Sequence, residues 1–185
     1  MKQYTNLYDN MVHSRFKKLS SLADIDFKIL DKRIEFELDT HGNKIQYFNV
    51  TSNYVDRFIA SLGEHSQHFY TSFVNIETSV PPHTDIVDQV NINFYIETGN
   101  YRTTFYKSTE NASKFTYADH GDGHAYRIEE LEPIDSFVAY PGDVYILNGK
   151  VIHGVDSTNC LPRKFLQVSA NDLDYNQVLE ILNLC

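Results

Sequence analysis

The segment from Phe69 to Ser169 is a succession of short β-type runs with turn-forming residues between them. The runs span residues 69–76, 90–96, 102–107, 135–139, 144–147 and 163–169, and the turn signals are Pro81-Pro82, Gly99-Asn100, Pro141-Gly142 and Asn148-Gly149. Aromatic residues make up 14% of the chain, with 13 Tyr and 12 Phe, and they favour the half-buried surface of a sheet. Many short strands without helical patterns between them predict a β-sandwich or jelly roll rather than a parallel α/β sheet.

The flanking segments predict a hairpin and helices. Residues 1–24 are polar with scattered apolar positions, which predicts a short helix followed by a loop. Apolar and charged residues alternate over 34–38, a break follows at 40–43, and the apolar pattern resumes over 45–50, as in a β-hairpin. Ser52 or Asn53 can cap a helix that ends at Gly63, and residues 174–184 have the pattern of a last amphipathic helix. The expected fold is mainly β with flanking helices.

Length and charge limit the class of protein. At 185 residues and 42% hydrophobic, the chain predicts a single domain over 1–185, with an N-terminal hairpin and helix support over 1–68, a β core over 69–170 and a C-terminal helix over 171–185. The formal charge of -9 and the lack of a basic run argue against stable nucleic-acid binding. No apolar leader or membrane-length apolar run occurs, and Cys160 and Cys185 are too few for a disulfide framework. These features predict a cytoplasmic protein that does not bind membranes.

A metal-binding pattern begins at His83. Residues two apart in a strand project to the same side, so His83 and Asp85 can reach one ion. A third ligand can come from His153, which follows the Asn148-Gly149 turn. Two imidazoles and one carboxylate leave open coordination positions, which is the ligand set of oxygen-activating non-haem Fe(II) sites.

An arginine follows at a fixed interval. Arg163 comes ten residues after His153, at the start of the last β-type run. A buried arginine on an inward strand face is costly unless it pairs with a carboxylate, and its planar fork suits a bidentate one. The alternative is a surface arginine that pairs with a nearby carboxylate such as Asp156.

With these residues in order, the segment from about Phe69 to Ser169 resembles the double-stranded β-helix, a cupin-like jelly roll, of the Fe(II)/2-oxoglutarate-dependent dioxygenases. The resemblance implies that His83, Asp85 and His153 are the metal ligands at the catalytic centre, and that Arg163 binds the distal carboxylate of 2-oxoglutarate. It also implies O2 as cosubstrate and hydroxylation of a small metabolite or an amino-acid side chain.

The chain departs from the family at one position. The family often has Arg-x-Ser in the last segment, and Phe165 stands where the hydroxyl would be. Tyr95, Tyr106 or Thr104 could supply a hydroxyl instead, and the sequence does not choose among them.

Several alternatives stay open at this stage. The same ligands could serve a cupin-type metalloenzyme with Fe, Mn or Zn that uses no 2-oxoglutarate, or the chain could be a non-catalytic jelly-roll binding module. The polar segment Ser108 to Glu132 is expected to be a mobile loop that covers the mouth of the site. Within it, His120 and His124 belong to a solvated loop, form a second metal site, or reach into the active site from a lid.

Overall fold

The computed structural model describes residues 16–21, 26–37, 44–85, 87–109, 114–116, 123–157 and 161–184. Within these ranges, the strands form one seven-stranded and one six-stranded antiparallel sheet. The larger sheet has the spatial order β1 (Phe16–Ser21), β11 (Asp143–Asn148), β6 (Val90–Glu97), β13 (Arg163–Ala170), β4 (Phe69–Ile76), β3 (Lys44–Thr51), β2 (Lys28–Glu37). The smaller one has the order β10 (Leu131–Val138), β7 (Arg102–Ser108), β12 (His153–Asp156), β5 (Val80–Asp85), β9 (Gly123–Tyr126), β8 (Lys114–Thr116).

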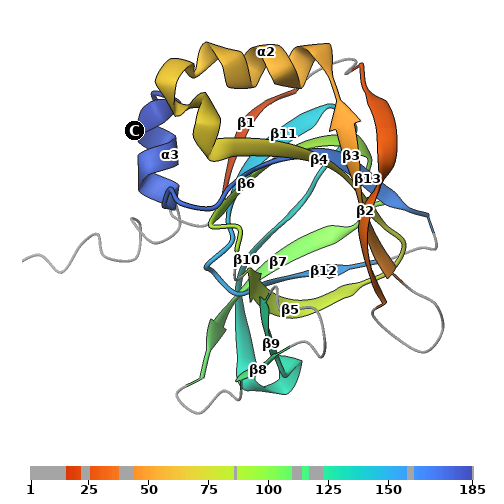
Figure 1. Ribbon diagram of the computed structural model, residues 1–185. Helices are drawn as coiled ribbons and strands as arrows, with labels where there is room; N and C mark the ends of the chain where they lie inside the picture. Colours follow the sequence, from red (N-terminus) through yellow and green to blue (C-terminus); the bar gives the residue numbers. More distant parts are fainter. Residues whose placement is uncertain are drawn as a thin grey trace, which may run out of the picture.

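The core strands alternate between the two sheets. Strands β4, β6, β11 and β13 are neighbours in the larger sheet, while β5, β7, β10 and β12 are neighbours in the smaller one. The chain therefore crosses from one sheet to the other at most core connections, which is the winding of a double-stranded β-helix. Figure 1 shows the two sheets as facing layers. The predicted jelly-roll fold is confirmed.

The N-terminal strands extend the larger sheet at both of its edges. Strands β2 and β3 form the predicted hairpin and add to β4, while β1 adds to β11. The prediction of a helix and loop over 1–24 is wrong for residues 16–21, which form β1, and its other residues lie outside the described ones. The cause is tertiary, because the Phe16 ring stacks on Phe105 of the facing sheet with ring centroids 5.1 Å apart.

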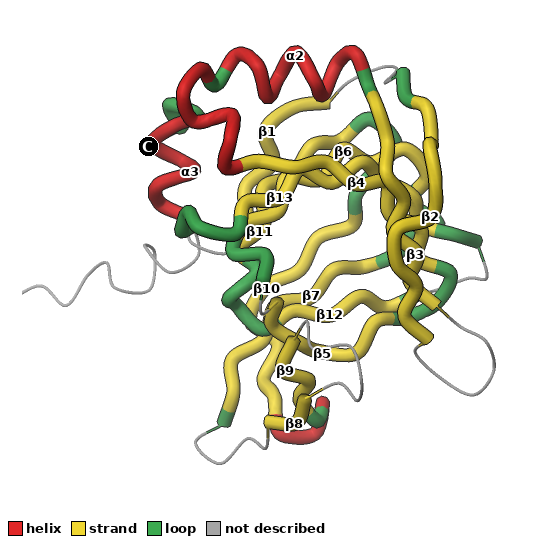
Figure 2. Tube along the Cα trace, viewed as in Figure 1, coloured by secondary structure: helices red, strands yellow, loops and turns green. Residues whose placement is uncertain are grey.

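The helices lie against the outer face of the larger sheet, as the tube view also shows (Figure 2). Helix α2 (Asn53–Ser61) begins after Ser52, whose hydroxyl accepts a hydrogen bond from the backbone N–H of Val55 at 3.2 Å. The 3-10 helix η1 (Gly63–His68) follows it. Helix α3 (Tyr175–Ile181) begins with a capping box between Asp174 and Gln177. Both predicted helices are confirmed.

Alternate residues of the larger sheet belong to two separate cores. Val55 and Val178 of the helices pack with outward residues of the sheet, namely Val90, Ile92, Phe94, Val144, Ile146, Leu166 and Val168. The inner core lies between the sheets and includes Val74, Tyr95, Phe105, Phe137, Tyr145, Val155 and Phe165. This alternation is the period-two pattern of a sheet that is covered on both faces.

The predicted loop over Ser108 to Glu132 is partly wrong. Its described residues form β8, β9 and the 3-10 helix η2 (Ile128–Glu130), and β9 pairs with β5. Pairing with β5 satisfies backbone groups that a loop would leave to water. The closing movement over the site stays a prediction. No helix in the described ranges is both long and apolar enough to cross a membrane.

Candidate metal centre and cavity

Strand pairing brings the three predicted metal ligands together. His153 of β12 lies directly opposite His83 of β5, with ring centroids 4.4 Å apart. Asp85 follows two residues later on the same face of β5. Its Oδ1 lies 3.5 Å from Nε2 of His83, and its Oδ2 lies 4.0 Å from Nε2 of His153.

Backbone carbonyls orient both imidazoles. Nδ1 of His83 lies 2.8 Å from the carbonyl oxygen of Pro81, and Nδ1 of His153 lies 2.9 Å from that of Val151. Because a carbonyl only accepts, each Nδ1 carries the proton in these bonds. In a neutral ring of this tautomer, the lone pair is on Nε2, the atom that can bind a metal. Such outer hydrogen bonds fix the tautomer of metal-binding histidines.

Burial and charge set the protonation of the cluster. Burial lowers the pKa of His153 to about 4, and the nearby charge of His83 adds to this effect. Burial would also lower the pKa of His83, but its hydrogen bond with Asp85, the charge of that carboxylate and the hydrogen bond with the Pro81 carbonyl together raise it. Burial would raise the pKa of Asp85, but that hydrogen bond and the charges of His153, His83 and Lys150 lower it. At neutral pH, Asp85 is therefore a carboxylate and His153 a neutral imidazole.

The carboxylate of Asp85 has a supporting hydrogen bond from the larger sheet. Nδ2 of Asn91, on β6, donates to Oδ2 of Asp85 at 3.0 Å, and Oδ1 of Asn91 lies 2.7 Å from Oγ of Ser169. Asn91 and Ser169 are both buried. The bond links the two sheets and orients the carboxylate.

The turn that precedes His153 is in close contact with Asp85. The backbone N–H of Asp85 donates to the carbonyl of Gly149 at 2.8 Å. A Cβ on Gly149 would lie 2.6 Å from Oδ2 of Asp85 and 2.5 Å from the backbone oxygen of Asp88. Real Cβ atoms do not approach so closely, so glycine is required here by close contact.

The donor set fits one divalent ion. One ligand atom from each of His83, Asp85 and His153 lies within 4.8 Å of the others. Ligands at about 2.1 Å from an ion, on one face of an octahedron, stand about 3 Å apart, so the separations between these atoms need to shorten by at most about 2 Å. No other such group of three occurs among the described residues. His124 is exposed on β9, and His120 lies outside the described residues.

Arg163 is buried in the wall of the cavity that the three candidate ligands also line. Its residue exposure is 2%, and one guanidinium nitrogen donates to the hydroxyls of Tyr95 at 2.8 Å and Thr103 at 2.9 Å. Its Nε has no hydrogen-bond partner, and no carboxylate in the described part of the chain lies within ion-pair distance. An unpaired buried charge is costly, so this arrangement fits an anionic ligand such as a carboxylate.

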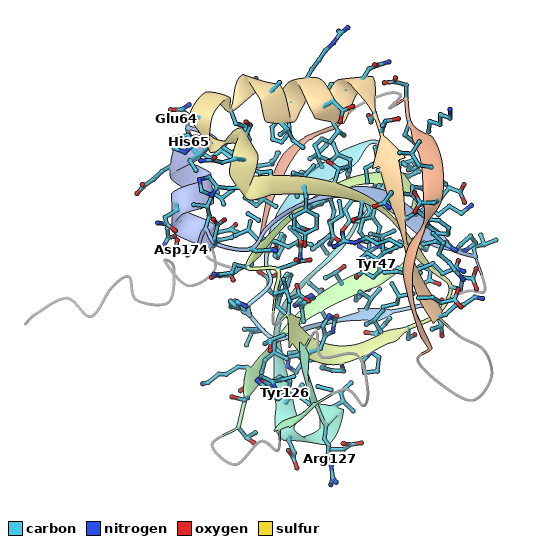
Figure 3. The ribbon with its side chains drawn as sticks, in the orientation of Figure 1. Tyr47, Glu64, His65, Tyr126, Arg127 and Asp174 are labelled. Carbon is cyan, nitrogen blue, oxygen red and sulfur yellow. The ribbon has the colours of Figure 1, made fainter. Side chains whose placement is uncertain are left out.

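One cavity between the sheets holds all four predicted site residues. It is lined by the three candidate ligands, by Arg163, Phe165 and Gln167 from one face of β13, and by Asn93, Tyr95 and Thr103. Tyr47 lines it from the N-terminal hairpin, and Figure 3 shows that side chain between the two sheets. Of the three hydroxyls considered from the sequence, only that of Tyr95 lies beside Arg163. Thr104 and Tyr106 do not line the cavity, whereas Thr103 does.

The sequence reasoning missed Asn91, Ser169 and Thr103. The signal for Asn91 was present, because Asn91 and Asn93 alternate with Val90, Ile92 and Phe94 in a strand that is otherwise apolar. Amide side chains at alternate positions of a buried strand indicate a polar inner face. Nothing in the local sequence shows that Thr103 rather than Thr104 lines the cavity, because this depends on which face of β7 points inward.

Comparisons with known proteins give only distant structural similarity. No protein-family model matches the chain, and no curated protein matches it in sequence. A crystal structure of the epimerase SnoN in complex with Fe3+, alpha ketoglutarate and nogalamycin RO is 11% identical, with a TM-score of 0.49, over 75% of this chain and 68% of that one. A point mutant of oxalate decarboxylase from Bacillus subtilis is 17% identical, with a TM-score of 0.38, over 78% of this chain and 31% of that one. The site must therefore be judged on its own geometry.

Proposed function

We propose that this protein is an Fe(II)- and 2-oxoglutarate-dependent oxygenase that hydroxylates a small metabolite or an amino-acid side chain. One observation carries the proposal. The facial donor set of His83, Asp85 and His153 shares a cavity with Arg163, a buried cation without a carboxylate partner in the described part of the chain. A protein that only bound a metal would not require an unpaired buried arginine in the same cavity. An arginine with a purely structural role would not need to share a cavity with a metal site.

The three donors would hold Fe(II) and leave its remaining positions open toward the cavity. When bound, Fe(II) and 2-oxoglutarate would supply the activation of O2, with one oxygen atom ending in a hydroxyl on the substrate carbon and the other in succinate, as CO2 is released. The protein's part is to hold the donors, orient the cosubstrate and shield the reacting carbon from water.

Arg163 would bind the carboxylate of 2-oxoglutarate that is remote from the metal. Its guanidinium can form a charge-assisted bidentate pair with that group. Tyr95 and Thr103 already position the guanidinium, and their hydroxyls lie where the same carboxylate can reach them. They would replace the hydroxyl that the family often places at the position of Phe165, whose ring centroid is 5.8 Å from Cζ of Arg163.

The test is whether succinate formation and O2 uptake both require Fe(II), 2-oxoglutarate and the donor set. We expect the wild-type protein to convert 2-oxoglutarate to succinate slowly without substrate and faster with it. Asp85→Ala should abolish both, whereas His124→Ala, which changes an exposed histidine of β9, should not. A protein that binds metal at this site but forms no succinate under any condition is a metalloenzyme of another kind, and one that binds no metal is a binding module.

A further inference from the structure

Two buried amide side chains lie next to each other in the wall of the cavity. Asn93 of β6 and Gln167 of β13 are directly opposite in the ladder that joins these strands, so their side chains are on the same face of the sheet. Both residues line the cavity, with exposures of 4% and 7%. None of the steps proposed above uses these two side chains, which we call the amide pair.

The hydrogen bonds of the amide pair are incomplete. Oδ1 of Asn93 is buried and has no partner in the described part of the chain, and Nδ2 of Asn93 donates to the hydroxyl of Tyr95 over a long 3.4 Å. The Gln167 side chain forms no hydrogen bond with any described residue. A buried amide without its partners costs free energy, which a bound ligand with matching groups would recover.

The amide pair lies between the candidate metal ligands and Arg163. Along β6, the inward residue before Asn93 is Asn91, which donates to the carboxylate of Asp85. The inward residue after it is Tyr95, whose hydroxyl accepts a hydrogen bond from Arg163. Successive inward residues of a strand are about 7 Å apart. A group bound at the amide pair is therefore only a few bonds from the metal centre.

The cosubstrate would follow the opposite wall of the cavity. In the smaller sheet, Phe105 is paired with His153, and Thr103, two residues earlier on β7, is paired with Val155. The guanidinium of Arg163 reaches across from the larger sheet to Thr103, at 2.9 Å. A 2-oxoglutarate held by the metal and by Arg163 would thus lie along the smaller sheet. The amide pair would face it from the larger one.

The cosubstrate cannot complete the hydrogen bonds of the amide pair. At neutral pH, 2-oxoglutarate has acceptor oxygens but no N–H or O–H donor, whereas Oδ1 of Asn93 requires a donor. Gln167 adds two donors and a further acceptor. A carboxamide has two N–H donors and a carbonyl acceptor in one plane, so it can pair with both side chains. A carboxylate has no donor, and an ammonium has no acceptor.

We propose that Asn93 and Gln167 bind a carboxamide group of the substrate, with the carbon to be hydroxylated on the metal side of that group. The inference rests on the proposed function and specifies the substrate class of the same site. The carboxamide can belong to a free metabolite or to an amide side chain of a peptide. A carboxylate of the same shape would set its oxygens against the carbonyl of Asn93, and sites built to bind an N–H discriminate strongly against such analogues.

Calorimetry under anaerobic conditions tests this without turnover. The protein, loaded with Fe(II) and 2-oxoglutarate, is titrated with free asparagine, free glutamine, nicotinamide, and the N-acetyl methylamides of asparagine and glutamine, which mimic peptide residues. Each is paired with the compound that has a carboxylate in place of the carboxamide. We expect binding of at least one carboxamide, and binding roughly 10-fold or more weakly by its carboxylate counterpart. Carboxylates that bind equally well, or carboxamides that all fail to bind, would overturn the proposal.

Substitutions of similar shape assign the contacts. Asn93→Leu and Gln167→Met should each weaken carboxamide binding roughly 10-fold or more, while the affinity of the Fe(II) protein for 2-oxoglutarate stays that of the wild type. The matched control is Asn75→Leu, because Asn75 is also buried with an unpartnered Oδ1 but does not line the cavity. It should bind both ligands normally.

Urea unfolding shows whether each variant is folded, and we expect the midpoint of Asn93→Leu not to fall, since the substitution removes an unsatisfied polar atom. An Asn93→Leu protein that loses affinity for 2-oxoglutarate as strongly as for the carboxamide would place the amide pair in the cosubstrate site and overturn the proposal. So would unchanged carboxamide binding in both Asn93→Leu and Gln167→Met.

The same titrations distinguish this inference from the proposed function. If 2-oxoglutarate binds to the Fe(II) protein but no carboxamide does, the oxygenase proposal stands and the carboxamide proposal is wrong. If 2-oxoglutarate itself does not bind, the oxygenase proposal fails and the carboxamide proposal fails with it.

Discussion

The two faces of the seven-stranded sheet are built from alternate residues of the same strands, yet their chemistry differs. The outward residues of β6 and β13 are Val90, Ile92, Phe94, Leu166, Val168 and Ala170. The inward ones include Asn91, Asn93, Tyr95, Arg163, Phe165, Gln167 and Ser169. Both sets are buried, so exposure to solvent does not explain why only one of them is polar.

The difference separates stability from binding. The apolar face gains free energy from burial alone, at about 25 cal/mol per Å² of surface. The polar face has a desolvation cost that its own hydrogen bonds do not fully offset, because Oδ1 of Asn93 and Nε of Arg163 have no partner. We infer that the outer face of β6 and β13 serves stability, while the polar residues of their inner face are kept for ligands.

The largest expected effect is at the proposed metal ligands. His153→Ala removes one of three donors, and the protein should lose stoichiometric Fe(II) while remaining folded. Metal analysis after anaerobic reconstitution, with circular dichroism for the fold, measures both. His124→Ala is the control and should keep its metal. A His153→Ala protein with full metal content would place the centre elsewhere.

Truncation of a residue on the outer face should lower stability and leave ligand binding unchanged. Leu166 is fully buried between the sheet and the helices, so Leu166→Ala should destabilise the protein by about 2–5 kcal/mol in urea unfolding. The folded fraction should bind Fe(II) and 2-oxoglutarate as the wild type does. A specific loss of cosubstrate affinity in this variant would break the separation between the faces.

The close contact between the backbone of Gly149 and Asp85 tests how this carboxylate is positioned. Gly149→Ala would push a methyl group into the carboxylate of Asp85 and should weaken Fe(II) binding roughly 100-fold, by displacing a ligand. The control is Gly154→Ala, where the closest contacts to the added Cβ are 3.2 Å and the effect should be smaller. Competition with a chelator of known affinity measures both. Equal affinities would show that the turn does not position Asp85.

The smallest effect is expected at the support of the carboxylate. Asn91→Ala removes the hydrogen bond to Asp85 without changing a ligand, so Fe(II) affinity should fall only about 10-fold. The same chelator competition applies. A loss as large as that of His153→Ala would mean that Asn91 acts as more than a support, and no loss would mean that Asp85 is oriented by other contacts.

Much of the fold could be predicted from local sequence patterns. Short β-type runs, the break at 40–43 and the cap at Ser52 are local signals, and they specified most strands and both helices correctly. The strands β1 and β9 were not predicted, because their pairing with β11 and β5 depends on tertiary contacts. Strand propensity is weak without such partners.

The site residues, too, could be predicted only in part from the sequence. His83, Asp85, His153 and Arg163 could be selected because their spacing along the chain carries information, and they line one cavity. The partners of these residues could not be selected, since Asn91 reaches Asp85 from the facing sheet. The inward face of a strand is specified by its register, and a shift by one residue would exchange the two faces.

The most direct test of the oxygenase proposal is anaerobic titration of the Fe(II) protein with 2-oxoglutarate, followed by the metal-to-ligand charge-transfer band. We predict a saturable band in the wild type, binding weaker by roughly 100-fold in Arg163→Ala, and intermediate binding in Arg163→Lys, which keeps the charge but not the fork. Metal content is checked in each sample. A wild-type protein that holds Fe(II) but develops no band, or an Arg163→Ala variant with unchanged affinity, would contradict the account.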